Sequence, residues 1–78
     1  MNEDEVVRAW VRTSAKESML AEAAAELRET RAESAEALTR VRVLVVCADV
    51  EGIPRSRIAE LLGVNRSTVY RVLGEDAR

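Results

Sequence analysis

Residues that interrupt helices are confined to the last third of this 78-residue sequence, where they occur as Gly52, Pro54, Gly63 and Gly74. The segment of residues 3–31 is instead dominated by strong helix formers such as Ala, Glu, Leu and Arg, and it holds no Gly or Pro. Because Gly and Pro are the residues that most oppose helix continuation, this segment predicts a long N-terminal helix. The expected fold class is all-α.

The sequence leaves open whether residues 3–50 form one helix or two. Apolar content falls over residues 29–34 and rises again afterwards, which favours a break there. Three patterns typical of a helix start, in which Asn, Ser or Thr is followed three residues later by Glu, begin at Asn2, Ser14 and Thr30. One uninterrupted helix over residues 3–50 is the alternative.

The apolar run of residues 41–47 has the composition of a strand, but no second run of this kind could pair with it. Read as a helix, it belongs to one buried stripe at helical spacing, formed by Leu38, Val41, Val45 and Ala48. We therefore predict a helix that ends at Gly52, with Cys47 as a small core residue without a redox or metal role.

Two short helices are predicted in the last third, over residues 55–62 and 66–73, with a glycine-containing turn between them. Gly63 occupies the turn position that needs a positive φ, and Asn65 is a good N-cap for the second helix. The small Ala59 would let the two helices cross closely. This arrangement is a helix-turn-helix.

Val64 is expected to fill the gap between these two helices. The complete predicted core of the helix-turn-helix is Ile58, Ala59, Leu62, Gly63, Val64, Val69 and Val72. With the preceding helix it forms a trihelical domain over residues 35–78, which follows an acidic N-terminal segment over residues 1–34.

Charge divides the chain in the same way as these segments. The formal net charge is −2, but residues 1–39 hold five basic and nine acidic residues, whereas residues 40–78 hold seven basic and five acidic ones. Residues 54–73 alone have a balance of +3. A local positive charge of this kind favours contact with phosphate, so the distribution predicts a nucleic-acid partner that the net charge conceals.

Residues 58–73, IAELLGVNRSTVYRVL, resemble the C-terminal helix-turn-helix of serine recombinases, the DNA invertases and resolvases. In that family a Gly, a small apolar residue and then a Ser-Thr-apolar-Tyr-Arg run open the recognition helix. The resemblance covers residues 53–74 and is shared with many small repressors. It implies DNA binding and not recombination, because residues 1–40 are too short and too rich in Ala and Glu to form a catalytic domain.

The resemblance also implies roles for individual side chains on the second helix. Ser67 and Arg71 would read base edges in the major groove, while Thr68 and Tyr70 would hold phosphates. Arg66 departs from the family, which often has a smaller residue there, and we expect it to contact a base as well. Arg55 and Arg57, beside the first helix of the pair, are also expected to contact phosphates.

A single helix-turn-helix reads few base pairs, so we expect a homo-oligomer, and a dimer first. An apolar face on the N-terminal segment would supply the subunit contacts through Val6, Val7, Trp10, Leu20 and Leu27. Packing of this face back onto the chain's own core is the alternative.

The expected function is sequence-specific binding of double-stranded DNA by a small, cytoplasmic, nucleoid-associated transcription regulator of bacterial or phage type, acting as a repressor would. A plasmid-segregation or excision accessory protein that binds repeated sites is one alternative, and a protein-interaction adaptor is another. With no His and one Cys, the sequence predicts no enzyme, metal or cofactor, and its longest apolar run is too short for a membrane span.

Overall fold

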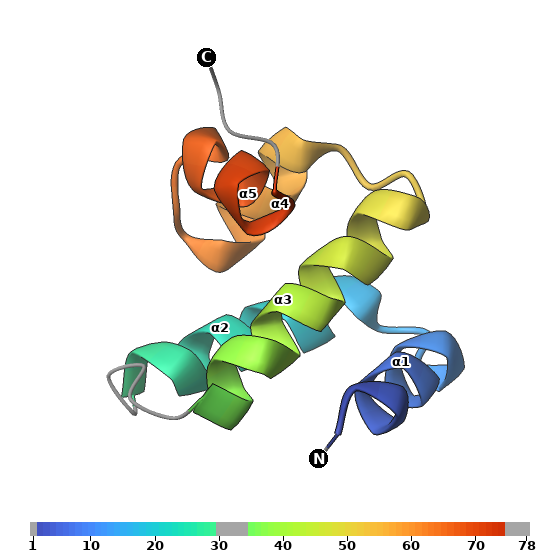
Figure 1. Ribbon diagram of the computed structural model, residues 1–78. Coiled ribbons are helices and arrows are strands. Elements are labelled where there is room, and N and C mark those ends of the chain that lie inside the picture. The colour runs from blue at the N-terminus through green and yellow to red at the C-terminus, as the bar shows by residue number, and fades with distance from the viewer. Residues whose placement is uncertain (1, 30–34, 75–78) are drawn as a thin grey trace.

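The structure, a computed structural model, describes residues 2–29 and 35–74, and all regular structure in these ranges is helical (Figure 1). The all-α prediction is confirmed. The helices are α1 (Glu3–Arg12), α2 (Lys16–Glu29), α3 (Ala35–Val50), α4 (Arg55–Leu62) and α5 (Arg66–Val72). Across the described ranges, no helix is both long enough and apolar enough to cross a bilayer.

The predicted single helix over residues 3–31 is wrong, because the chain turns between α1 and α2. Thr13 is extended, with φ −76° and ψ 142°, and its hydroxyl accepts a hydrogen bond from the Ala15 amide at 3.1 Å. The ammonium of Lys16 then donates to the carbonyls of Trp10 and Thr13, at 3.0 Å each. These bonds satisfy polar groups that a helix end leaves unpaired, so the turn needs neither Gly nor Pro.

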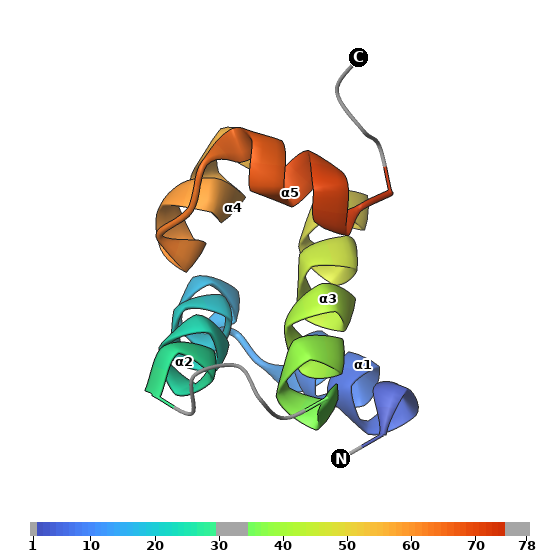
Figure 2. The same cartoon turned by 60° about the vertical axis from the view of Figure 1, so that its left-hand side comes forward.

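The predicted break over residues 30–34 lies outside the described residues. On its two sides, α2 and α3 are separate helices that pack against each other, so the alternative of one helix over residues 3–50 is also wrong. Figure 2 shows α3 at the centre, with α1 and α2 beside its lower half and the pair of α4 and α5 above.

One hydrophobic core joins the N-terminal segment to the last three helices. It contains Val6 and Trp10 from α1, Leu20 from α2 and apolar side chains of α3, α4 and α5. Val6, Trp10 and Leu20 are each at most 1% exposed. This corrects the expectation that these three form subunit contacts, because the chain's own helices already cover them. Leu27 is partly exposed and Val7 is exposed.

The C-terminus of α3 ends as the sequence predicts. Gly52 has φ +89°, and the amides of Gly52 and Ile53 donate to the carbonyls of Asp49 and Ala48 at 3.0 Å each. This is the paired hydrogen-bond pattern that closes many helices at a left-handed glycine. Cys47 lies partly buried against the core, and burial, the largest cause, together with the charge of Glu51 raises the pKa of its thiol, so it behaves as a small apolar residue.

Candidate nucleic-acid interface

The turn between α4 and α5 is built around Gly63. Its φ is +71°, a left-handed conformation that glycine adopts without the steric cost of a Cβ atom. The Gly63 amide donates to the Glu60 carbonyl at 3.2 Å, and the Val64 amide donates to the Ala59 carbonyl at 3.0 Å. The chain then enters α5 at Arg66, with Asn65 in the N-cap position but without a capping bond from its side chain.

Most of the predicted helix-turn-helix core is buried. Ile58, Ala59, Leu62 and Val69 are buried, and Val72 packs partly buried against them. Val64 differs from the prediction, because its side chain is 39% exposed. It lines the edge of an apolar groove between α2, α3 and the turn and does not fill the centre of the helix pair.

The outer face of α5 presents the three predicted base-reading residues, Arg66, Ser67 and Arg71, and all three are exposed. Their side chains make no ion pair with any other described residue. Val69 holds the opposite face of α5 in the core. The helix therefore exposes unpaired hydrogen-bond donors and positive charge on one side only, which suits insertion into a groove.

Arg55, predicted to hold a phosphate, links three helices. Its Nε donates to the Asp49 carboxylate at the end of α3 at 3.0 Å, and its guanidinium lies 4.7 Å from the centre of the Tyr70 ring on α5. Tyr70 and Thr68, the other predicted phosphate contacts on α5, are both partly buried. A cation over an aromatic ring is an attractive contact, so Arg55 adds a link between α5 and the helices α3 and α4.

Arg57, also predicted to hold a phosphate, faces two carboxylates. Its guanidinium donates to Glu17 of α2 at 2.7 Å and to Glu60 of α4 at 2.6 Å. The hydrogen bond from Arg57 lowers the pKa of Glu17, and the same bond raises the pKa of Arg57. Arg57 would have to leave both carboxylates to reach a phosphate, so it is not a free phosphate contact in this structure.

The Glu17–Arg57 pair makes the stability of the protein depend on pH. Because the folded state lowers the pKa of Glu17 below its ordinary value, the pair stabilises the fold above that value and stops doing so as the pH falls through the lowered pKa. We expect Glu17→Gln to unfold at a lower urea concentration than the wild type at neutral pH, and the two midpoints to converge once the pH falls below the lowered pKa of Glu17.

The matched control for this prediction is Glu22→Gln, which neutralises another exposed carboxylate of α2 that makes no ion pair with the described residues. If the difference in urea midpoint between Glu17→Gln and the wild type is the same at neutral and at acidic pH, the Glu17–Arg57 pair is not the source of the pH dependence.

One contact between α2 and the helix-turn-helix cannot be recognised in the sequence. Arg28, near the end of α2, donates to the Leu62 carbonyl at the end of α4 at 3.0 Å. Its guanidinium also lies 3.4 Å from the point where a side chain on Gly63 would begin. The partners are 34 residues apart, and no local pattern marks such a bond. Through it, α2 supports the turn that precedes α5.

Comparison with known proteins supports this arrangement. Residues 34–74, slightly more than half of the chain, match a family model described as a homeodomain-like domain. The match begins next to α3 and ends just after α5, so it covers the three helices of the helix-turn-helix unit. It does not single out the serine recombinases. Neither the search of curated proteins nor the search of solved structures found a match.

Proposed function

The chain belongs to the homeodomain-like family of helix-turn-helix DNA-binding domains, and we propose that it is a sequence-specific regulator of transcription. In this proposal α5 enters the major groove of double-stranded DNA, where Arg66, Ser67 and Arg71 contact base edges. Thr68 and Tyr70 hold phosphates beside the groove. The protein acts by occupying its site, as a repressor does, and catalyses no reaction.

The observation that carries the proposal is the asymmetry of α5. One side of the helix is held in the core by Val69, and the other side exposes two arginines and a serine without intramolecular partners among the described residues. Arginine can donate two parallel hydrogen bonds to guanine, which makes it the commonest base-reading residue in the major groove. The acidic α1 and α2 lie away from this face (Figure 2), so their charge does not oppose DNA there.

The proposal extends to the assembly that binds DNA. One recognition helix reads only a few base pairs, and useful specificity needs two helices on half-sites about one turn of DNA, roughly 34 Å, apart. We propose that the protein binds as a dimer to a palindromic or directly repeated site. Binding along a longer array of repeats would instead favour the role of a segregation or excision accessory protein.

The test begins with selection of bound fragments from random double-stranded DNA, which gives the preferred site. We expect Arg71→Ala to weaken binding to that site by about 1–3 kcal/mol, or roughly 5- to 150-fold in Kd, and to relax the preference at one base pair. Fluorescence anisotropy at fixed salt measures both quantities, because affinity for DNA depends steeply on salt.

Ser18→Glu is the control for this variant, since it changes the net charge by the same unit at an exposed position of α2. It is expected to keep the wild-type affinity and base preference. Wild-type affinity and base preference in Arg71→Ala would refute the placement of α5 in the groove and would favour the adaptor alternative.

A further inference from the structure

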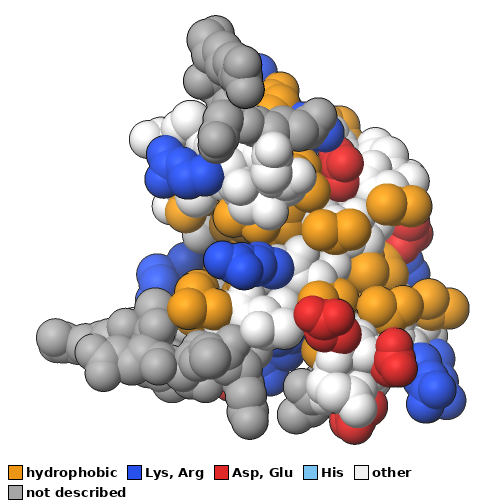
Figure 3. Space-filling view, in the orientation of Figure 1, with side chains coloured by type: hydrophobic (Ala, Val, Ile, Leu, Met, Phe, Trp, Pro, Cys, Tyr) orange, Lys and Arg blue, Asp and Glu red, His pale blue; other side chains and the backbone are white. Residues whose placement is uncertain are grey.

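A second surface of the molecule carries an apolar patch that the helix-turn-helix does not use. Six large hydrophobic side chains are exposed among the described residues, and four of them are valines that line one groove between α1 and α3. We call this surface the valine patch and define it as Val7, Val11, Val46 and Val50. Figure 3 shows hydrophobic side chains gathered over α1 and the C-terminal half of α3.

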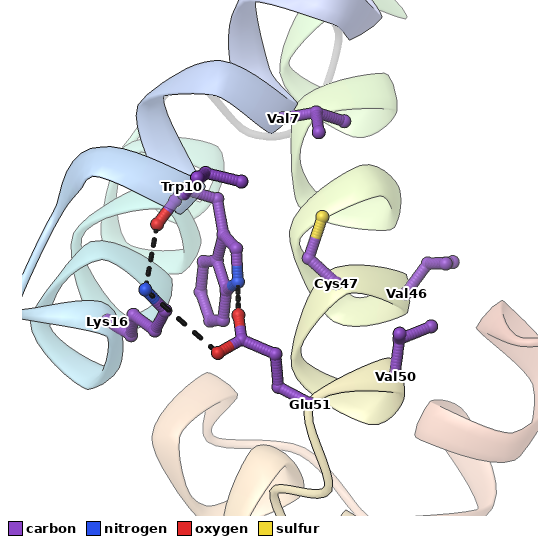
Figure 4. Close-up of a pocket in the computed structure, with 8 residues that line it drawn as sticks. Val7, Trp10, Lys16, Val46, Cys47, Val50 and Glu51 are labelled. Atoms are coloured by element: carbon purple, nitrogen blue, oxygen red, sulfur yellow. Dashed lines mark hydrogen bonds and ion pairs between the residues drawn. The ribbon is translucent and has the colours of Figure 1, made fainter.

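The valine patch is formed by helical spacing on both of its helices. Val7 and Val11 are four residues apart on α1, and Val46 and Val50 are four residues apart on α3, so each pair forms a short ridge. In Figure 4, Val7, Val46 and Val50 point to the same side. All four valines are exposed, and the two most exposed are Val11 at 70% and Val50 at 80%.

The floor of the groove is formed by side chains that contact one another. The Trp10 indole donates a hydrogen bond to the Glu51 carboxylate, and the Lys16 ammonium lies 4.0 Å from the other oxygen of that carboxylate and 5.4 Å from the indole centre (Figure 4). The groove has a volume of about 390 Å³ and is lined mostly by apolar side chains. Exposed apolar side chains that gather in one place are a common feature of interaction sites, so the valine patch is a candidate contact with another molecule.

We infer that the occupant is a second copy of this chain, related by a two-fold axis that passes near Val7 and Val11. The charges of α1 favour this occupant. The first turn of α1 is acidic, with Glu3, Asp4 and Glu5, and its later part is basic, with Arg8 and Arg12. Two copies of α1 that lie antiparallel across the axis place each acidic turn against the basic turn of the other copy, which makes the surface complementary to itself.

The position of the patch agrees with the function proposed above, on which this inference builds by supplying the contact that makes the dimer. α1 and α5 lie on opposite sides of α3 in Figure 1 and near its opposite ends in Figure 2, so a dimer formed through α1 leaves both copies of α5 exposed. Of the subunit contacts expected from the sequence, Val7 belongs to the valine patch; Val46 and Val50 on α3 are additions.

Sedimentation of the full chain without DNA tests the inference, from about 1 to about 200 µM, a range in which a modest dimer dissociates. The wild type is expected to reach the mass of two 8.6 kDa chains. Val11→Glu combined with Val50→Glu is expected to raise the dimer Kd by roughly two orders of magnitude, because two carboxylates would lose water on association. Circular dichroism checks that this variant is folded, as the exposure of both side chains predicts.

The control adds the same two charges elsewhere, through Ser18→Glu on α2 and Ser56→Glu on α4, both exposed, and is expected to dimerise like the wild type.

A charge exchange tests the antiparallel arrangement of the two copies of α1. Asp4→Arg alone and Arg12→Asp alone should each weaken the dimer about two- to fivefold, and the double variant should recover most of the loss.

Each outcome bears on one proposal. A wild type that stays monomeric over the whole range, or a valine variant that dimerises like the wild type, overturns the inference, and the regulator proposal then depends on DNA binding alone. A wild type that dimerises, and that the valine variant disrupts as expected, but that selects no DNA overturns the regulator proposal and leaves the inference standing. The folded monomeric variant is expected to bind a single half-site as well as the wild type does.

Discussion

Deletion of residues 1–34 is expected to leave the remaining chain unfolded at 25 °C, although it retains all three helices of the family's helix-turn-helix unit. The deletion removes the buried side chains Val6, Trp10, Leu20, Ala23 and Ala24, which belong to the same core as α3 and α4. It also exposes Leu44 and Val45, both 0% exposed in the structure. Natural domains have only about 5–15 kcal/mol of stability, and a chain of this size has a small core, so the loss should exceed what the domain holds.

Far-UV circular dichroism and urea titration of residues 35–78 measure the outcome. The helix content and the unfolding transition of the full chain should both be lost, and affinity for the selected DNA site should fall with them. A fragment that unfolds cooperatively and binds this DNA as tightly as the full chain would show that residues 35–78 are an independent domain, as the division of the sequence at residue 34 predicts.

Trp10→Ala is expected to destabilise the protein by about 3–5 kcal/mol, the usual cost of truncating a fully buried aromatic side chain. Trp10 is 1% exposed and is the largest fully buried side chain among the described residues. Its removal leaves a cavity between α1 and α3, and it also takes away the indole that donates to Glu51. The free energy of unfolding from urea titration gives the magnitude.

Two further variants separate the sources of this cost. Glu22→Gln, at an exposed position of α2 without an ion pair to the described residues, should change the stability by at most about 0.5 kcal/mol. Glu51→Gln keeps a hydrogen-bond acceptor for the indole and should cost far less than Trp10→Ala. A cost below about 1 kcal/mol for Trp10→Ala would mean that α1 contributes little to the core.

The helix-turn-helix could be predicted from the sequence because its signals are local. Gly63 supplies a left-handed residue, Asn65 precedes the next helix, and the apolar spacing of Ile58 and Val69 faces inward. Each signal depends on a few neighbouring residues, and the structure brings them together at one turn. The end of α3 at Gly52 was predictable for the same reason.

Other features could not be predicted because they depend on partners distant in the sequence. Arg57 resembles a free phosphate contact until Glu17, 40 residues earlier, is placed beside it. The N-terminal apolar face was assigned to subunit contact because nothing in its spacing tells a partner chain from α3. Its division between buried Trp10 and exposed Val11 becomes visible only when the angle of α1 against α3 is known.

The aromatic side chains of the protein are one tryptophan and one tyrosine, without phenylalanine, and they lie on different helices. Trp10 on α1 lies against a carboxylate and an ammonium, beside the valine patch, whereas Tyr70 on α5 lies under Arg55. Indole emission, excited selectively, therefore reports on the α1 surface and not on α5. Association through that surface can thus be followed in an unlabelled sample by the emission of a single side chain.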